Sequence, residues 1–205
     1  MIRAVLWDFG GVILTSPFEA FNFYEQRKGL PLDFIRSVNA ANPHDNAWAL
    51  LERTEIDGEE FDRRFAAESE ALGHRVRGAD VLELLSGEVR PEMLELLDAV
   101  IAAGYKTACL TNNVAGGEDR AEVRSVMDRF DEVVESSVVG VRKPEVEFYE
   151  IACAKLDVSP SDCVFLDDLG INLKPAAAMG MTTIKVVTPD QAIADLRAAL
   201  AMPSG

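Results

Sequence analysis

From Pro91 onward the chain alternates between short apolar runs and helical segments, and this alternation limits the possible folds more than any other sequence feature. We predict strands over 105–110, 163–166 and 182–187, and helices over 91–103, 118–129, 145–156, 170–179 and 189–201. Two apolar pairs, Val133-Val134 and Val138-Val139, continue the alternation after the second of these helices. Regular exchange of strands and helices is typical of an α/β protein built on a parallel sheet.

The N-terminal segment 2–7 is a nearly continuous apolar run, and it predicts a further strand. Runs without polar alternation suit a central parallel strand that is covered on both faces. The run ends in Asp8-Phe9-Gly10-Gly11, where two glycines allow a tight turn and a close approach of ligand to backbone. An acidic side chain is therefore expected at the tip of a buried strand.

Between these two parts lies a segment with helical periodicity and little strand signal. The predicted helices cover 18–28, 32–41, 45–53, 58–72 and 78–85, and glycines and prolines separate them. We therefore predict two domains: an α/β core of 1–15 and 91–205, and an inserted all-helical domain of 16–90. The expected fold is a three-layer, Rossmann-like parallel sheet carrying a helical cap. The connecting segments, near Pro17 and Pro91, are the expected hinge.

Composition excludes several classes of function. The net charge of -15 opposes binding to nucleic acids and to anionic membranes, since both need clustered lysine and arginine. The apolar run at the N-terminus is too short for a signal peptide, and no segment reaches the length of a membrane span, so a cytoplasmic location is expected. The three cysteines fit no zinc pattern and are expected to be buried thiols.

Four polar clusters fall at predicted strand ends or helix starts. They are 8–11, Thr111-Asn112-Asn113, Arg142-Lys143-Pro144 and Asp167-Asp168. In an open parallel sheet, ligands bind beyond the carboxyl ends of the strands. We therefore expect these clusters to meet in one site.

The order and spacing of the clusters resemble the four motifs of the haloacid dehalogenase-like superfamily. The segments VGVRKP (139–144) and VFLDDLGINLKPA (164–176) are most similar to its phosphatase-like branch, which includes the N-terminal domain of soluble epoxide hydrolases. The resemblance covers 1–15 and 91–187, whereas the helical insert matches in position and size only. Any one of these motifs is common, but four in the expected order are specific.

The resemblance implies a magnesium-dependent hydrolase in which Asp8 attacks the substrate. It assigns the Mg²⁺ ligands as Asp8, the backbone carbonyl of Gly10 and Asp168. A carboxylate that attacks a phosphate meets charge repulsion, and a divalent cation relieves it. Lys143 is implied to orient Asp8 and to neutralise phosphate oxygens.

The remaining implied roles concern the phosphoryl group and the surroundings of the metal. The Thr111 hydroxyl and the Asn112 backbone N–H are implied to bind the phosphoryl oxygens, and Thr111 can also act as an N-cap. Asp167 is implied to support the metal or Lys143, and Asn172 to hydrogen-bond the acidic cluster. The implied partner is a small phosphorylated molecule, and the protein is expected to be a monomer or a homodimer.

One position departs from the family pattern. Most phosphatases of this superfamily carry a second aspartate two residues after the nucleophile, which acts as general acid and base, and here that position is Gly10. The loss of such a catalyst typically costs about 10²–10⁴-fold in rate. Water, or a cap residue such as His44 or Asp45, is a candidate replacement.

Three functions therefore compete. The first is a phosphatase that forms an aspartyl-phosphate on Asp8. The second is a 2-haloacid dehalogenase, a branch that lacks the second acid but works without metal and usually without the Asp167-Asp168 pair. The third is a catalytically weak domain that binds a phosphorylated ligand.

The cap offers no recognised motif for substrate. Its apolar side chains are expected to form a small core of their own, and its arginines a solvated face (Trp48, Leu51, Phe61 and Phe65; Arg53, Arg63 and Arg64).

Overall fold

The computed structural model describes residues 1–115 and 120–203, and its centre is a five-stranded sheet. The strands are β1 (Ala4–Asp8), β2 (Lys106–Thr111), β3 (Glu132–Glu135), β4 (Cys163–Asp167) and β5 (Thr182–Lys185). They lie in the order β3-β2-β1-β4-β5, and each neighbouring pair is parallel. This arrangement confirms the predicted Rossmann-like α/β fold.

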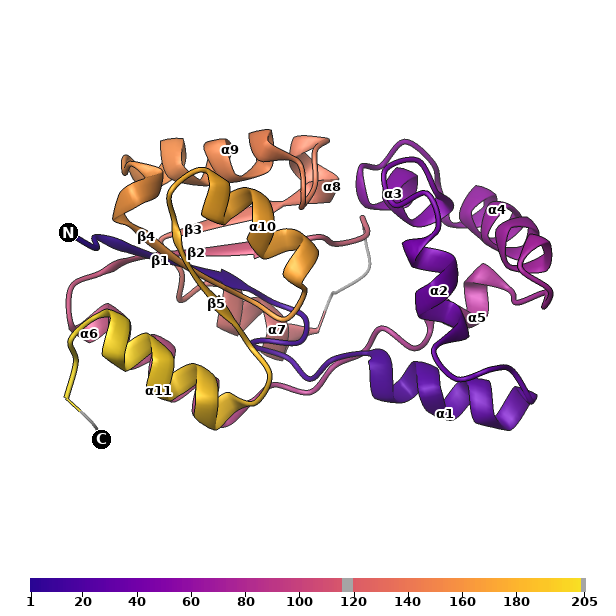
Figure 1. The fold of residues 1–205 in the computed structure, drawn as a ribbon, viewed down its shortest axis with the longest axis horizontal. Helices are drawn as coiled ribbons and strands as arrows, with labels where there is room; N and C mark the ends of the chain where they lie inside the picture. Colours follow the sequence, from indigo (N-terminus) through magenta and orange to yellow (C-terminus); the bar gives the residue numbers. More distant parts are fainter. Residues whose placement is uncertain (116–119, 204–205) are drawn as a thin grey trace.

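Helices cover both faces of the sheet (Figure 1). One face packs against α6 (Pro91–Ala102), α7 (Ala121–Met127) and α11 (Pro189–Ala199), and the other against α9 (Val146–Leu156) and α10 (Gly170–Ala178). In β1, Val5 and Trp7 enter the first of these cores, while Ala4 and Leu6 enter the second. Burial on both faces explains why the run is apolar at every position from Ala4 to Trp7.

Five further helices form the cap, which lies beyond one edge of the core in Figure 1. They are α1 (Phe18–Lys28), α2 (Phe34–Ala40), α3 (Ala47–Glu52), α4 (Gly58–Ala71) and α5 (Gly78–Leu82). Their buried side chains form a separate cluster that includes Leu51, Phe61 and Phe65. All five lie within residues 16–90, and we retain those bounds as the proposed division.

Two chain segments join the cap to the core, and they pair with each other. Thr15 N donates to Glu88 O at 2.8 Å, and Arg90 N donates to Ile13 O at 2.9 Å. Leu14 and Val89 form an antiparallel bridge in the same place. The paired connection follows directly after β1, so it holds the cap beside the carboxyl ends of the strands.

Some predicted bounds differ from the observed ones. Val138-Val139 does not continue a strand: β3 ends at Glu135 and the pair lies in the short helix α8 (Ser136–Val139), which Gly140 ends in a left-handed conformation. The helix predicted from 32 starts at Phe34, because the Glu25 carboxylate binds the backbone N–H groups of Asp33 and Ile35. The start predicted at 118 lies outside the described residues.

No helix in the described ranges has both the length and the hydropathy that a membrane crossing requires.

Candidate active site

The polar clusters meet at the carboxyl end of the sheet, on the side that faces the cap. Asp8, Thr111 and Asp167 are the last residues of β1, β2 and β4, which are adjacent strands. The parallel register pairs Trp7 with Leu166 and Asp8 with Leu110, so strand geometry alone brings the three ends together.

Lys143 is the centre of the site. Its Nζ lies 2.6 Å from Asp8 Oδ1 and 2.9 Å from Asp167 Oδ2, and its side chain is 1% exposed. Asp167 is also held by Asn172 Nδ2, at 3.0 and 3.1 Å, and by the backbone N–H of Leu169 at 2.8 Å. Lys143 therefore ties the first strand to the fourth, and Asp167 is positioned by donors on three sides.

Asp8, Asp167 and Asp168 form an acidic cluster in which one oxygen of each lies within 4.8 Å of the others. Burial raises the pKa of Asp8 well above its usual range, and the neighbouring Asp167 carboxylate raises it further. Burial, and then Asp167, also raises the pKa of Asp168, to about 6. Three carboxylates facing one ammonium group favour the approach of a cation, and oxygen ligands of this kind suit Mg²⁺.

The charge of Lys143 is stabilised by its position. Burial alone lowers the pKa of the ammonium group, but the carboxylates of Asp167 and Asp8 outweigh that effect, so the pKa lies above its ordinary value. The side chain is therefore a fixed positive charge at neutral pH. A fixed charge at this place can orient Asp8 and attract an anionic group beside it.

Gly10 and Gly11 differ in whether a side chain would fit at their positions. Gly11 has a φ of 83°, and a Cβ there would lie 2.3 Å from Asp168 Oδ2, so the close approach of the two loops excludes other residues. A Cβ on Gly10 would meet nothing within 4 Å. Sterics therefore explain Gly11 but not the missing acid at position 10.

The segment after β2 makes contacts that the sequence did not suggest. The Asn112 side chain accepts from Lys143 N at 2.9 Å and donates to Lys143 O at 3.0 Å. Asn113 binds Glu135, Ser136 and the N–H of Ser137 instead. The Asn112 side-chain amide thus fixes the backbone of Lys143. This role is separate from the binding of a phosphoryl group, which we expected of the Asn112 backbone N–H.

A cavity of about 1410 Å³ lies between the site and the cap, and its lining includes Asp8, Gly10, Thr111, Lys143 and Asp168. The cap contributes both polar and apolar side chains to the wall, and the apolar ones include Phe18, Phe21, Trp48, Leu82 and Leu85. Our expectation for Trp48 was therefore incomplete, because it packs on Phe61 at 5.0 Å between ring centroids and also lines the cavity.

The charged cap residues lie in different surroundings. His44 and Asp45 are not among the cavity-lining residues of the described chain. Arg63 and Arg64 both pair with Glu60, as expected for a solvated face, whereas Arg53 contacts Glu145 of the core. Sequence reasoning also missed Glu52, a buried cap carboxylate that pairs with Arg142 and lines the cavity.

Comparisons with known proteins point to one family. A model of haloacid dehalogenase-like hydrolases matches residues 2–180. The chain is 33% identical over 206 residues to mouse acyl-CoA dehydrogenase family member 10, covering 98% of this chain and 19% of that protein. It is 29% identical over 211 residues to mouse bifunctional epoxide hydrolase 2, covering 95% and 38%. The chain therefore spans well under half of either mouse relative.

A relative of similar length is sesquiterpene phosphatase astK of Aspergillus oryzae, which is 26% identical over 182 residues, covering 87% of each chain.

Solved structures share the fold. A HAD-like family hydrolase from Porphyromonas gingivalis has a TM-score of 0.68 at 21% identity, covering 99% of this chain and 100% of that one. A HAD family enzyme from Bacteroides thetaiotaomicron, in complex with magnesium and inorganic phosphate, has a TM-score of 0.57 at 20% identity, covering 90% and 94%. L-2-haloacid dehalogenase from Xanthobacter autotrophicus has a TM-score of 0.61 at 17% identity, covering 100% and 85%.

Proposed function

Because the chain belongs to the haloacid dehalogenase-like hydrolase family and is a hydrolase, we propose that it is a phosphatase acting on a small phosphate monoester, with Mg²⁺ as cofactor. The observation that carries this proposal is the acidic cluster of Asp8, Asp167 and Asp168 around Lys143. A dehalogenase that works without metal has no use for two extra carboxylates, one buried and one half-buried, beside its nucleophile. A metal-dependent phosphatase needs them to balance the charge of a cation.

The proposed reaction begins with Asp8. Its carboxylate attacks phosphorus, the bond between phosphorus and the ester oxygen breaks, and the leaving oxygen takes a proton from a water molecule to become the alcohol. Water then attacks the aspartyl-phosphate, which releases inorganic phosphate and restores Asp8. Lys143 orients the Asp8 carboxylate, while the Thr111 hydroxyl and Asn112 N–H bind phosphoryl oxygens. When bound by Asp8, the Gly10 carbonyl and Asp168, Mg²⁺ would shield the phosphate charge from the nucleophile.

The cavity supports a particular kind of alcohol. Several aromatic and aliphatic cap side chains line it, and its volume of about 1410 Å³ exceeds that of a typical small-molecule site, about 300–1,000 Å³. We propose a leaving alcohol with an extended apolar body. The name of the Aspergillus relative, a sesquiterpene phosphatase, supports this choice. We retain a small molecule, and not a nucleic acid or a membrane, as the proposed partner.

Purified protein is expected to release inorganic phosphate from an isoprenyl monophosphate faster than from a sugar phosphate in the presence of Mg²⁺. Chelation by EDTA is expected to stop the release, and added Mg²⁺ to restore it. Phosphate and chloride are measured in parallel, with 2-chloropropionate as the second substrate. Chloride release that is insensitive to EDTA would favour the dehalogenase alternative.

Gly10→Asp is expected to raise kcat, because it adds a general acid and base where space is open. A Cβ at this position meets nothing within 4 Å, and Gly10 itself lines the cavity. Such a group is worth about 10²–10⁴-fold in rate. The matched control is Gly10→Asn, which adds the same volume without a titrating proton. Equal rates in both variants and the wild type would mean that another group already supplies the proton.

A further inference from the structure

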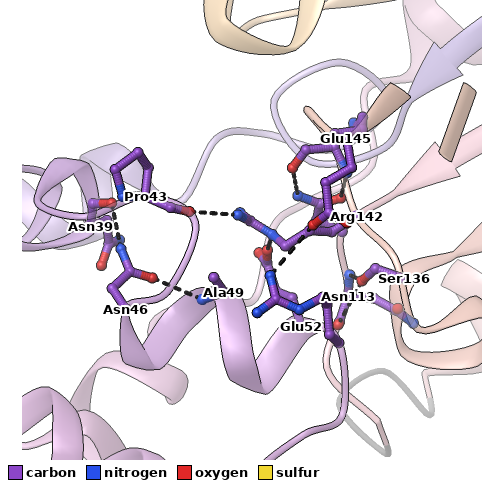
Figure 2. A network of polar contacts seen from close by, with 12 residues as sticks. Asn39, Pro43, Asn46, Ala49, Glu52, Asn113, Ser136, Arg142 and Glu145 are labelled. Atoms are coloured by element: carbon purple, nitrogen blue, oxygen red, sulfur yellow. Dashed lines mark hydrogen bonds and ion pairs between the residues drawn. The ribbon is translucent and has the colours of Figure 1, made fainter. Parts of the chain in front are cut away.

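The cap and the core also contact each other beside the site, away from the paired connection at Thr15 and Glu88. Figure 2 shows the Arg142 side chain reaching the cap, with dashed lines to the Pro43 carbonyl and the Glu52 carboxylate. Arg142 Nε lies 2.5 Å from Glu52 Oε2, and an Arg142 terminal nitrogen lies 3.0 Å from Pro43 O. The Arg142 and Glu52 side chains are only 12% and 8% exposed. Arg142 directly precedes Lys143 in the chain.

The backbone of Lys143 is also held from within the core. The Asn112 side chain lies in the loop after β2 and bonds to the backbone of Lys143. Its amide holds both the N–H and the carbonyl of Lys143, at 2.9 and 3.0 Å. One cap carboxylate therefore pairs with the residue before Lys143, while Asn112 fixes the backbone of Lys143 itself.

We propose that Glu52 is a positioning residue: with the cap seated, its carboxylate holds Arg142 and thereby keeps the Lys143 ammonium between Asp8 and Asp167. The inference rests on the proposed function, since it concerns the reaction at Asp8. It also means that the catalytic arrangement is complete only while the cap covers it, because Glu52 belongs to α3 and leaves with the cap.

The contact needs the full charge of Glu52. Burial raises the pKa of the Glu52 carboxyl group, and the charges of Arg142 and Lys143 offset only part of that rise. Replacing Glu52 would leave the buried Arg142 charge without its carboxylate partner, so we expect the backbone next to Lys143 to shift. A displacement of about 1 Å in a catalytic group is enough to cost about 10²-fold in rate.

A second cap–core ion pair provides a matched control. Arg53 lies 3.4 Å from Glu145, and the Thr54 hydroxyl donates to Ser137 O at 3.0 Å nearby. The Glu145 side chain thus joins cap and core as Glu52 does, but it is more exposed, at 32%. If cap attachment alone matters, Glu52→Gln and Glu145→Gln should behave alike.

The test measures kcat and KM for an isoprenyl monophosphate, with Mg²⁺, in Glu52→Gln, Glu52→Asp, Glu145→Gln and wild type. We expect Glu52→Gln to lower kcat by about 10–100-fold with a smaller change in KM. Glu52→Asp keeps the charge and should recover part of the rate, and Glu145→Gln should stay within about 2-fold of wild type. Equal losses in Glu52→Gln and Glu145→Gln, or no loss in either, would overturn the proposal.

A second measurement does not depend on turnover. The ¹⁵N NMR signal of the Lys143 ammonium group reports its contacts with Asp8 and Asp167, and it should shift or broaden in Glu52→Gln but not in Glu145→Gln. A wild type without phosphatase activity but with this NMR pattern would refute the proposed function and keep the positioning role. If Glu52→Gln does not fold, Arg142→Lys tests the same contact from the core side, and an unchanged Lys143 signal there would refute the role.

Discussion

Asp8→Asn is expected to release phosphate at least about 10³-fold more slowly than the wild type, while folding at least as stably. The amide cannot form the aspartyl ester, so the covalent route is closed. The carbonyl oxygen of the new amide can still accept from Lys143 Nζ and from Phe9 N, which donate to Asp8 Oδ1 at 2.6 and 2.7 Å. The hydrogen bonds that hold the side chain are therefore retained.

The effect on stability follows from the pKa of Asp8. Its pKa is raised in the folded state, chiefly by burial and then by Asp167. A raised pKa means that the folded protein binds a proton more tightly than the unfolded chain, so stability from this group is present at low pH and is lost as the pH rises. Asparagine does not ionise, and at neutral pH without divalent cations the variant should match or exceed the wild type.

The measurement combines initial rates with thermal unfolding, in EDTA and in Mg²⁺. Mg²⁺ should raise the melting temperature of the wild type more than that of Asp8→Asn, because the variant loses one negative ligand. Asp98→Asn is the matched control, since it makes the same change in a surface ion pair with Arg129. Phosphate release by Asp8→Asn at the wild-type rate would remove Asp8 from the mechanism.

Much of this site could be predicted because parallel sheets place strand ends together. Asp8, Thr111 and Asp167 each follow an apolar run, and a polar residue at the end of a buried strand is visible in the sequence alone. The register in which the strands pair cannot be read from the sequence. The pairing of Trp7 with Leu166 decides that Asp8 lies next to Asp167, and it depends on packing across the whole sheet.

The cap contacts could not be predicted, for a physical reason. Glu52 and Arg142 are 90 residues apart, and neither belongs to a local pattern that requires the other. Glu52 resembles any charged residue at a helix end until the cap is placed over the core. Trp48 packs against the cap core as expected, but its place in the cavity wall could not be predicted, because helical periodicity does not separate these two surroundings.

Lys143→Met is expected to lower both the free energy of unfolding and the rate of phosphate release, whereas Asp8→Asn is expected to lower only the rate. Lys143 is almost fully buried between Asp8 and Asp167, at 2.6 and 2.9 Å, and removing it leaves two buried carboxylates without their cation. Loss of one partner from a buried ion pair typically costs about 3–5 kcal/mol of unfolding free energy. The rate should fall by about 10²–10³-fold, as for other fixed charges that stabilise a transition state.

Urea unfolding in EDTA measures the stability loss, and steady-state kinetics in Mg²⁺ measure the rate. Lys155→Met is the control, because Lys155 pairs with Glu132 at 2.8 Å but is 42% exposed, and surface pairs contribute about 0–1 kcal/mol. Added Mg²⁺ should return part of the stability that Lys143→Met loses, since a divalent cation can take over the charge balance of the acidic cluster. A Lys143→Met variant as stable in EDTA as Lys155→Met would mean that the three acids do not depend on the ammonium group, and the electrostatic account of this site would be wrong.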